Sequence, residues 1–379
     1  MLVFKKLIST AAATIGGTFI AFAGLGINSA QAVLLVGNTA GNNVVRYDEN
    51  TGNFLGTFIP PNTGGLTSPD DIVFGPDGNL YISSGNSSTG KILRFNRRTG
   101  AFIDVFATGG GLIRPYGIAF GPDGNLYTSS FLSDQILRFN GQTGAFIDVF
   151  AFGNGQPGGL NGPNDLLFTP DGRLLVTTQG SVAVPGDLPG EFRPDFSGGL
   201  PSQILSYDIL TGASSVFVES ATPLPDTFGF VSFLGLAIGP NGDLFTTDFA
   251  NGIRVYDIQT GALKLTISTN YTSAPGSISS NFIGNLAFVG NTLFTTGFDF
   301  TQGNQGAILR YDGLTGEPLP GAGNSGAVFV STSPNLQRPI GIAYDPAPIP
   351  TPALLPGLVG VGIAALRKRR QEQSDVSEA

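Results

Sequence analysis

The side chains that most often perform chemistry in proteins are absent from this sequence. The chain of 379 residues contains no His and no Cys. Without His it lacks the commonest general base, the usual zinc ligand and one member of every Ser-His-Asp triad. Without Cys it has no thiol chemistry, and disulfides cannot indicate its redox compartment. The remaining candidates are oxygen groups, which can bind a hard cation or, with a raised pKa, act as a base.

Charge and composition further narrow the possible partners and fold classes. The chain has 27 Asp and Glu against 19 Lys and Arg, a net charge of −8. This balance disfavours nucleic acid as a partner, because phosphates require a basic surface. With 41% apolar residues and 30 Phe, the chain can bury a large core. Its 56 Gly and 26 Pro, with only 12% charged residues, predict an all-β fold of short strands and tight turns.

A sequence repeat predicts the architecture. An aromatic residue followed by Asp or Asn, two variable residues and Thr-Gly recurs at spacings of roughly 44 to 68 residues, enough for four short strands per copy. The aromatic residues of the copies are Tyr47, Phe95, Phe139, Tyr207, Tyr256 and Tyr311. We therefore expect a six-bladed β-propeller with four-stranded blades over residues 33–346.

The segments around the repeat predict how the ring closes. Gly-Pro-Asp-Gly at residues 75–78 and 121–124 favours hairpin turns, because Pro sets φ and Asp-Gly tolerates positive φ. Around the first Gly-Pro-Asp-Gly turn, residues 72–74, 79–83, 91–95 and 101–106 have the apolar pattern of blade strands. Residues 33–59 supply three strands without a first, and residues 341–344 supply a first strand alone. We expect both chain ends to complete one blade.

The N-terminus has the pattern of a secretory signal peptide. Lys5 and Lys6 precede an apolar stretch over residues 7–27, and residues 30–32 read Ala-Gln-Ala. A basic start, an apolar middle and small residues before the cut predict cleavage after Ala32. An uncleaved anchor is the alternative. We therefore expect residues 1–32 to direct export across the inner membrane.

The C-terminus has the pattern of a membrane anchor. A Pro-rich linker, residues 347–352, leads into an apolar stretch, residues 353–366, and a cytoplasmic tail, residues 367–379. As a helix the stretch would span about 21 Å, short of a hydrocarbon core of about 30 Å. The basic residues that follow favour insertion, because they stay cytoplasmic and can snorkel. These residues are Arg367, Lys368, Arg369 and Arg370.

This C-terminal segment resembles a known sorting signal. The string Pro350, Thr351, Pro352 and Ala353, followed by the apolar stretch and the basic tail, resembles the PEP-CTERM class of bacterial signals in a Pro-Thr-Pro-Ala variant. The resemblance implies transient anchoring and processing by an exosortase-type transpeptidase, with the protein at the cell surface, in the periplasm or in the extracellular matrix. Thr351 stands where the better-known form has Glu, which leaves the processing enzyme open.

The repeat itself also resembles known families. Residues 69–81 and 115–127 share Pro-x-x-Ile-x-Phe-Gly-Pro-Asp-Gly-Asn-Leu-Tyr, a pattern similar to NHL-repeat propellers and to senescence-marker/gluconolactonase-like propellers. The resemblance covers nearly all of residues 33–346. Lactonase-like members hold a divalent metal in the central channel, on a Glu and several Asn or Asp residues at the start of the inner strands.

The lactonase resemblance implies specific metal-binding positions. They correspond to Asp70, Tyr116, Asn164, Leu234, Ile283 and Ile340, with Gly284 and Asn285 as an alternative alignment in the fifth position. Only Asp70 and Asn164 are natural oxygen ligands, and they are the candidates for Ca²⁺ or another divalent cation. The alternative is that both side chains cap strands by accepting nearby backbone N–H groups.

Three further features have two explanations each. Residues 179–203 form a Pro- and Gly-rich insertion in the fourth unit, which predicts either a lid or partner contact over the channel or a tolerated surface loop. Phe228, Phe230 and Phe233 favour core packing over a ligand platform. An Arg precedes the repeated aromatic at four positions, and we expect it to bond or stack between neighbouring blades. These residues are Arg46, Arg94, Arg138 and Arg310.

Three functions stay open at this stage. The first is an exported binding module that holds an extracellular polymer or protein through its top face and the insertion. The second is a metal-dependent, gluconolactonase-like hydrolase that uses Asp70 and Asn164. The third is a structural matrix protein. The missing His and the small number of metal ligands favour binding over catalysis.

Overall fold

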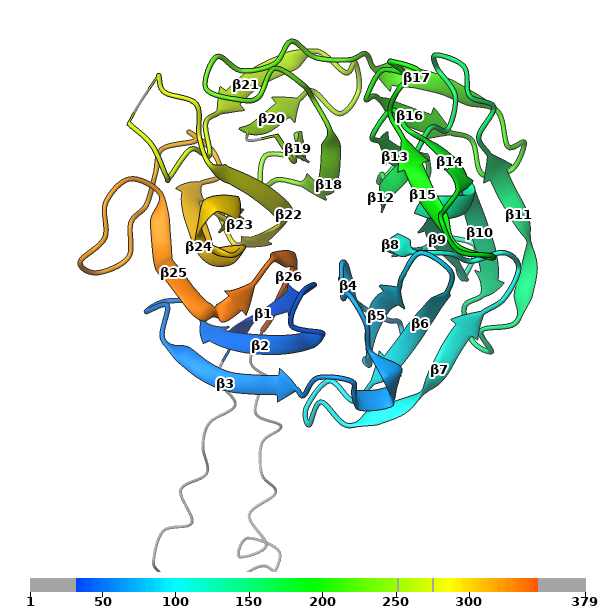
Figure 1. Ribbon diagram of the computed structural model, residues 1–379, viewed down its shortest axis with the longest axis horizontal. Helices are drawn as coiled ribbons and strands as arrows, with labels where there is room; N and C mark the ends of the chain where they lie inside the picture. Colours follow the sequence, from blue (N-terminus) through cyan, green and yellow to red (C-terminus); the bar gives the residue numbers. More distant parts are fainter. Residues whose placement is uncertain (1–31, 251, 275, 347–379) are drawn as a thin grey trace, which may run out of the picture. The chain divides into compact units, whose positions relative to one another are not determined.

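The computed structural model describes residues 32–346 except 251 and 275. These residues form six four-stranded antiparallel sheets around a common centre, the blades of a β-propeller (Figure 1). The predicted all-β, six-bladed fold is therefore confirmed. In this part of the chain no helix is long and apolar enough to cross a membrane. The predicted signal segment up to residue 31 and the linker, sorting motif, apolar stretch and tail over residues 347–379 lie outside the described residues.

Each blade runs from an inner strand at the central channel to an outer strand at the rim. Blade 1 contains β26 (Pro339–Asp345), β1 (Val33–Asn38), β2 (Asn43–Asp48) and β3 (Phe54–Ile59). Blade 2 contains β4 (Ile72–Phe74), β5 (Leu80–Gly85), β6 (Gly90–Phe95) and β7 (Phe102–Thr108). Blade 3 contains β8 (Pro115–Phe120), β9 (Asn125–Ser130), β10 (Gln135–Asn140) and β11 (Phe146–Phe152).

The other three blades follow the same plan. Blade 4 contains β12 (Pro163–Phe168), β13 (Leu174–Thr178), β16 (Ile204–Tyr207) and β17 (Ser214–Val218). Blade 5 contains β18 (Phe233–Ile238), β19 (Leu244–Asp248), β20 (Gly252–Tyr256) and β21 (Leu263–Ile267). Blade 6 contains β22 (Asn281–Val289), β23 (Thr292–Asp299), β24 (Gln305–Asp312) and β25 (Val328–Gln337).

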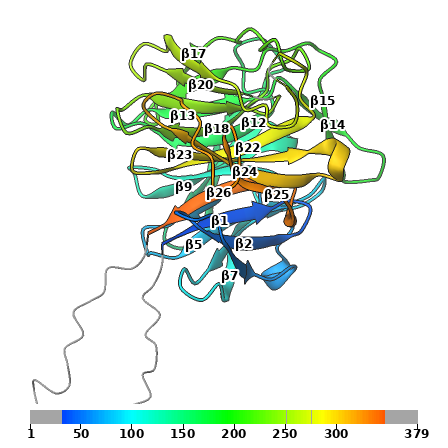
Figure 2. The same cartoon turned by 90° about the vertical axis from the view of Figure 1, so that its left-hand side faces the viewer.

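Short elements connect the blades and extend one of them. The insertion forms a separate two-stranded hairpin of β14 (Val182–Pro185) and β15 (Phe192–Asp195). Three single-turn 3₁₀ helices lie in connections: η1 (Thr63–Gly65), η2 (Phe131–Ser133) and η3 (Phe300–Gln302). In Figure 2 the hairpin lies at the face opposite the start of β1 and the end of β26. The described chain therefore begins and ends on the face away from the insertion.

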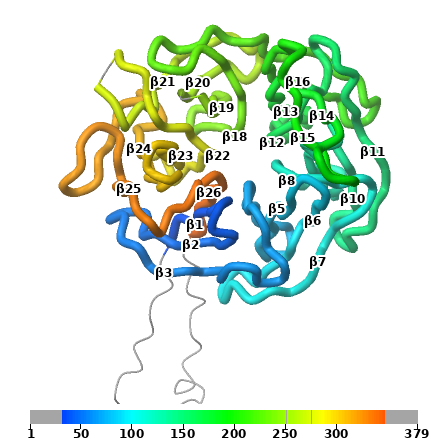
Figure 3. The backbone as a smooth tube through the Cα atoms, viewed as in Figure 1, coloured from blue at the N-terminus to red at the C-terminus, as the bar shows by residue number. Residues whose placement is uncertain are grey.

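Both chain ends complete blade 1, as the sequence predicts. β1 lies between β26 and β2 and pairs with both in antiparallel register, so that Leu35 is opposite Ala343 on one side and Arg46 on the other. The tube in Figure 3 shows the two ends of the chain side by side in this blade. This pairing satisfies the backbone groups that an open ring would leave on two strand edges.

Two kinds of turn repeat around the ring. In the Gly-Pro-Asp-Gly turn of blade 2, Gly78 has φ 75° and donates its N–H to the Gly75 carbonyl at 2.9 Å. In the Thr-Gly turn of blade 1, the Asp48 carboxylate accepts the Thr51 N–H at 2.7 Å, and Gly52 has φ 73°. Glycine is needed at both positive φ values, because a Cβ is strained there.

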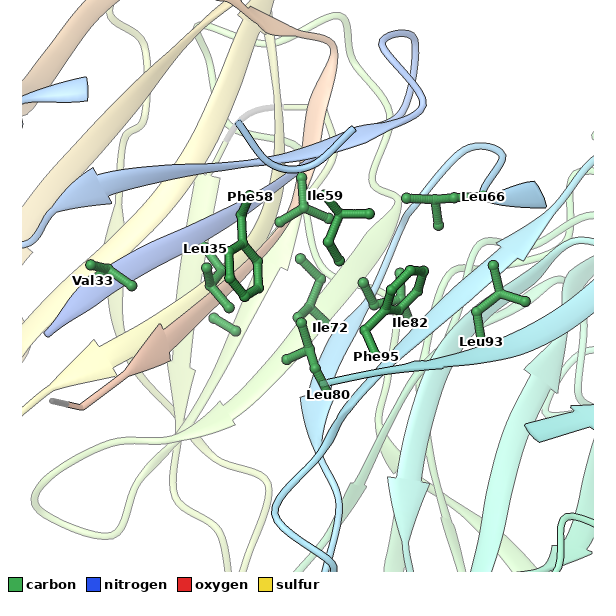
Figure 4. Packing of buried hydrophobic residues seen from close by; sticks show 12 residues of the cluster. Val33, Leu35, Phe58, Ile59, Leu66, Ile72, Leu80, Ile82, Leu93 and Phe95 are labelled. Carbon is green, nitrogen blue, oxygen red and sulfur yellow. The ribbon is translucent and has the colours of Figure 1, made fainter. Parts of the chain in front are cut away.

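The hydrophobic core consists of layers between adjacent blades. Figure 4 shows one layer, in which Leu35 and Phe58 of blade 1 face Ile72, Leu80 and other apolar side chains of blade 2. Each buried aliphatic or aromatic side chain contributes about 1.5–3 kcal/mol relative to exposure. Since every blade packs on two neighbours, these layers make the ring one cooperative unit and hold the inner strands in place.

The contacts of two recurring arginines differ from the expected bonding between neighbouring blades. Arg94 pairs with Asp104 and Arg138 pairs with Asp148, both at 2.5 Å between guanidinium nitrogen and carboxylate oxygen. In both blades the Asp lies directly opposite the Arg on the outer strand. The predicted bonding between blades is therefore wrong for these two, because cross-strand neighbours within a sheet are the nearest partners.

Candidate functional site

The described residues enclose a cavity of about 140 Å³ at the mouth of the central channel. It is lined by Asp70, Arg114, Tyr116, Phe131, Asn164, Gln179, Pro194, Phe196, Leu234, Phe249, Asn285, Arg338 and Ile340. Most of these residues lie at the start of an inner strand, while Pro194 and Phe196 come from the insertion. The cavity is therefore lined both by repeated positions of the inner strands and by the insertion of blade 4.

Strand register defines which inner-strand residues are equivalent. The pairing of inner and second strands shifts at the same place in four blades, between Pro115 and Ile118 in blade 3 and between Ile283 and Leu286 in blade 6. Ile283 therefore corresponds to Pro115, and the residue after each faces the mouth. The mouth ring is Ile340, Asp70, Tyr116, Asn164, Leu234 and Gly284, in the order of blades 1 to 6. The primary alignment through Ile283 is wrong, and the alternative through Gly284 and Asn285 is correct.

Asp70 is a buried carboxylate that already has partners. Its Oδ1 accepts the Thr39 hydroxyl at 3.1 Å, and its Oδ2 lies 3.2 Å from the Arg114 guanidinium. Burial raises the pKa of Asp70, while the charges of Arg114 and Arg338 and the Thr39 hydrogen bond oppose this rise. Asp70 and Asn164 both line the cavity, so the structure brings the two predicted ligands to one site.

The residues around Asp70 do not fit a divalent cation. Ca²⁺ takes about six to eight oxygen ligands, usually with several carboxylates. Here Asp70 is the one carboxylate among the lining residues, and a guanidinium occupies its open side. Among the described residues, no three His, Cys, Asp or Glu side chains are placed to share a metal. We therefore assign no step of chemistry to a metal at this mouth.

Two arginines define the charge of the cavity, and sequence analysis missed both. Arg114 and Arg338 each precede a proline at the start of an inner strand and have positive φ values of 51° and 49°. The equivalent positions of two other blades, Ser68 and Gly162, share this conformation. An arginine with a left-handed backbone conformation is unusual before a proline, and it marks a strained position. The repeated Arg-Pro at the equivalent positions of two blades is the signal that could have identified them.

Backbone hydrogen bonds hold both arginines in this conformation. The Arg114 N–H donates to the Thr89 carbonyl at 3.2 Å, and the Phe131 N–H donates to the Arg114 carbonyl at 3.2 Å. The Arg338 N–H donates to the Asn304 carbonyl at 2.8 Å, and the Thr39 N–H donates to its carbonyl at 3.1 Å. These bonds stabilise the strained backbone that places both side chains in the wall of the cavity.

The insertion covers one side of the mouth and is fixed to the propeller. The Ala183 N–H of β14 donates to the Asp134 carboxylate of blade 3 at 2.6 Å, and the Phe192 N–H of β15 donates to the Ser87 carbonyl of blade 2 at 2.7 Å. Asp134 also accepts the Gly162 N–H, at 3.0 Å. These contacts hold the hairpin beside the mouth, which is the position that the lid or partner-contact interpretation requires.

The opposite side of the mouth is apolar and aromatic. Leu234 and Ile340 pack with Phe298 in a buried cluster, and the Phe249 ring stacks on Phe282 with centroids 4.4 Å apart. Phe228, with 41% of its surface exposed, contacts Phe282 at 5.7 Å between centroids. Core packing is therefore correct for buried Phe233 and wrong for Phe228 and Phe230, which are exposed at the surface.

A second ring lies one residue further along the inner strands and is regular. In blade order it consists of Gly341, Asp71, Gly117, Asp165, Gly235 and Asn285, so that glycine alternates with an acid or amide. The Asp71 carboxylate accepts the N–H groups of Ile72 at 2.8 Å and of Ile118 in blade 3 at 2.9 Å. Asp165 does the same with Leu166 and, in blade 5, with Leu236 at 2.7 Å. Each acid therefore joins two blades.

Burial controls the ionisation of this second ring. Burial raises the pKa of Asp71 to about 6, although the hydrogen bonds from the Ile118 and Ile72 N–H groups lower it. Burial, followed by repulsion from Asp71, raises the pKa of Asp165 well above its ordinary value. Asn285 occupies the third polar position, and its Oδ1 has no hydrogen-bond partner among the described residues. The two carboxyl groups of this ring therefore resist deprotonation in the folded protein.

Comparisons with known proteins agree with the fold. No family model matches this sequence, and no curated protein matches it. The chain is similar to a solved structure titled as a Nidogen/Laminin complex, with 12% identity, a TM-score of 0.55 and coverage of 83% of this chain and 98% of that chain. It is also similar to a protein of unknown function from Bacteroides caccae, with 14% identity, a TM-score of 0.50 and the same coverage. These similarities define the class, a six-bladed β-propeller of the kind that carries many functions.

Proposed function

We propose that this propeller is a binding module whose ligand enters the channel mouth beneath the β14–β15 hairpin. The observation that carries the proposal is the cavity that residues of the hairpin and of the inner strands line together. Concave sites with apolar walls and a few convergent polar groups are the usual form of a ligand site. Binding is favoured over catalysis because Asp70, the carboxylate in the wall, is engaged by Arg114 and Thr39.

The size of the cavity limits what it accepts. Its volume of about 140 Å³ is close to that of an apolar protein cavity of about 150 Å³ that holds one benzene molecule. The ligand is therefore a small molecule or the end group of a polymer or protein chain. The exposed aromatic side chains next to the mouth offer further contact to a longer ligand.

The test replaces the lid and measures binding. Gly180 and Leu200 are adjacent, since a Cβ on Gly180 would lie 2.2 Å from the Leu200 carbonyl oxygen. Residues 182–198 of the full chain can therefore be exchanged for a short Gly-Ser linker. A thermal-shift screen uses small acids, amines, neutral aromatic compounds, oligosaccharides and short peptides. We expect compounds that stabilise the native chain and lose this effect in the lidless variant, whose own unfolding stays cooperative. Stabilisation that survives loss of the lid, or none at all, overturns the proposal.

We also propose that the protein is exported and, at least transiently, anchored to the membrane. The support is the sequence of both termini, with cleavage after Ala32 and a sorting signal at residues 350–370. The described chain begins and ends at the face opposite the hairpin. Mass spectrometry of fractionated cells tests this proposal. A mature N-terminus at Val33 and loss of the C-terminal tail support it, and an intact chain in the cytoplasm contradicts it.

A further inference from the structure

The wall of the cavity is divided into a charged half and an apolar half. Arg338, Asp70 and Arg114 belong to consecutive blades 1, 2 and 3, while Leu234 and Phe249 belong to blade 5 on the far side of the ring. A ligand that matches both halves has a charged group on one end and an apolar body on the other. The sign of that charge follows from the partners of the three ionisable side chains.

The two arginines have different partners. Arg114 forms an ion pair with Asp70 at 3.2 Å and lies over the Tyr116 ring at 5.2 Å. The Arg338 guanidinium lies 5.6 Å from the Phe298 ring centre, and among the described residues it has no ion pair or hydrogen-bond partner. The Nε atoms of Arg338 and Arg114 are both buried without an acceptor among the described residues, which carries a desolvation cost, but only Arg114 has an ion pair to offset it. Arg338 is therefore poised to receive an acceptor from a ligand.

Asp70 attracts Arg338 electrostatically but forms its ion pair with Arg114, and no other surrounding acid pairs with Arg338 among the described residues. Asp71 and Asp165 lie in the ring below, and each of their carboxylate oxygens already accepts a backbone N–H. The hairpin carries Asp187, Glu191 and Asp195, none of which lines the cavity. Two guanidinium groups and one carboxylate leave the wall with one net positive charge.

We infer that this mouth selects a carboxylate attached to a small apolar body, and that Arg338 binds the carboxylate. This inference rests on the proposed binding function and narrows it. A monoanion matches the single net charge, whereas a phosphate dianion would leave a buried negative charge uncompensated. A planar carboxylate can also accept two parallel hydrogen bonds from one guanidinium. The carboxylate comes from a free small acid or from the acidic end of a chain, and the chemistry at Arg338 is the same.

The geometry of Arg338 suits selective recognition. Its backbone is held at φ 49° by hydrogen bonds to Asn304 and Thr39, and its side chain lies against Phe298. A guanidinium already held in the bound geometry loses little conformational entropy when the ligand arrives. The apolar body then displaces water from the wall around Leu234 and Phe249, which strengthens the ion pair.

The experiment compares matched probes on the full chain by ligand-observed NMR titration. Benzoate and benzamide have the same shape and differ in charge, while N-acetyl-phenylalanine and its amide represent the end of a chain. We expect the acids to bind at least about tenfold more tightly than their amides, as a charge-assisted hydrogen-bond pair requires. Preference for benzoate or for N-acetyl-phenylalanine distinguishes a free acid from a chain end.

Three variants test the role of Arg338. Arg338→Gln should weaken acid binding about tenfold to a hundredfold and leave amide binding unchanged. Arg98→Gln, at an arginine in a turn far from the lining residues, is the matched control and should change neither. Asp70→Asn releases the Arg114 guanidinium from its ion pair and should strengthen acid binding several-fold. This gain tests the selection of an acid by the charge of the mouth even if Arg338→Gln fails to fold.

The outcomes separate this inference from the function on which it rests. Equal binding of acids and amides, or acid binding that Arg338→Gln and Asp70→Asn leave unchanged, overturns the inference while the binding function stands. Lid-dependent binding of neutral or cationic compounds alone has the same meaning. If no compound of the wider screen binds beneath the lid, both proposals fail.

Discussion

Two consecutive rings of the inner strands differ sharply in chemistry. The mouth ring places Ile, Asp, Tyr, Asn, Leu and Gly in succession around the axis, without any period. The ring one residue deeper alternates glycine with Asp, Asp and Asn. The deeper acids accept hydrogen bonds from backbone N–H groups of two blades, whereas the mouth contains an arginine whose side chain has no ion pair or hydrogen-bond partner among the described residues. Regularity therefore persists where blades pack on each other and ends at the cavity.

The deeper ring is regular because each blade makes the same contact with the next. Gly117 approaches Asp165 so closely that an added Cβ would lie 2.7 Å from its Cα. The Ser129 hydroxyl accepts the Gly117 N–H at 2.8 Å and donates to the Asn164 carbonyl of blade 4 at 2.5 Å. A repeated contact of this kind constrains the residue type in every blade, which the mouth ring does not require.

The largest expected effect is the loss of stability in Gly117→Ala. The new methyl group would meet the Asn164 carbonyl oxygen at 2.7 Å, so blades 3 and 4 must separate. We expect a cost of about 3 kcal/mol or more in unfolding free energy, measured by urea denaturation. Gly198→Ala is the control, because its Cβ meets only the Leu200 side chain at 3.8 Å. Equal stability of both variants would show that the deeper ring is not tightly packed.

A slightly smaller loss is expected for Asp165→Ala. The change leaves the N–H groups of Leu166 and Leu236 buried without acceptors, which costs about 2–4 kcal/mol. Asp187→Ala, at an exposed residue of the hairpin, should change stability by less than about 0.5 kcal/mol. Thermal unfolding of both variants gives the comparison. A cost at Asp165 no greater than at Asp187 would contradict a bridging role for the acid.

The deeper ring should also make stability depend on pH. Burial raises the pKa of Asp71 to about 6 and that of Asp165 well above its ordinary value. An acid with a raised folded-state pKa adds stability at low pH, and this is lost as pH rises through that pKa. Unfolding free energy should therefore fall by on the order of 1–3 kcal/mol between about pH 4 and pH 7. Turn residues such as Asp48, with a lowered pKa, act below this range.

The variant Asp165→Asn sharpens the pH measurement. It removes one of the two interacting carboxyl groups, so the fall in stability between acid and neutral pH should become shallower. Denaturant titrations at several pH values give the slope for both proteins. A native chain whose stability is flat or rises over this range would show that folding does not raise the pKa of these carboxyl groups.

The mouth ring should tolerate substitution far better. Arg338→Gln removes a cation that has no ion pair in the described part of the chain, so we expect a stability change below about 1 kcal/mol. The same variant is expected to lose acid binding, which separates function from stability at this residue. A loss as large as that of Asp165→Ala would instead place Arg338 among the residues that hold the ring together.

The smallest expected effect is that of calcium. Since the Arg114 guanidinium lies beside Asp70, adding Ca²⁺ or chelating it should shift the melting temperature by less than about 1 °C. Calorimetry of the full chain checks this directly. A tight site that disappears in both Asp70→Ala and Asn164→Ala would restore the metal-dependent hydrolase as the better hypothesis.

Much of the site was within reach of sequence reasoning, and the failures have identifiable causes. The resemblance to lactonase-like propellers predicts Asp70 and Asn164 at the channel, and both line the cavity. Ile283 was misaligned by one residue because its blade lacks the Pro that stands at this position in four of the other blades, and strand pairing resolves the register. Arg338 was missed because it lies about 220 residues along the chain from Arg114, the other arginine of the cavity wall.

The repeated aromatic and turn motifs were enough to specify six blades and their closure by both chain ends, because local turn chemistry and strand periodicity act over a few residues. The partners of each polar group at the centre depend instead on six strands that converge from distant parts of the chain. That convergence pairs Asp70 with Arg114, leaves the Arg338 side chain without an ion pair or hydrogen-bond partner among residues 32–346 as described, and brings the hairpin over the mouth. A side chain's charge is local, but its neutralisation depends on which neighbours the closed ring supplies.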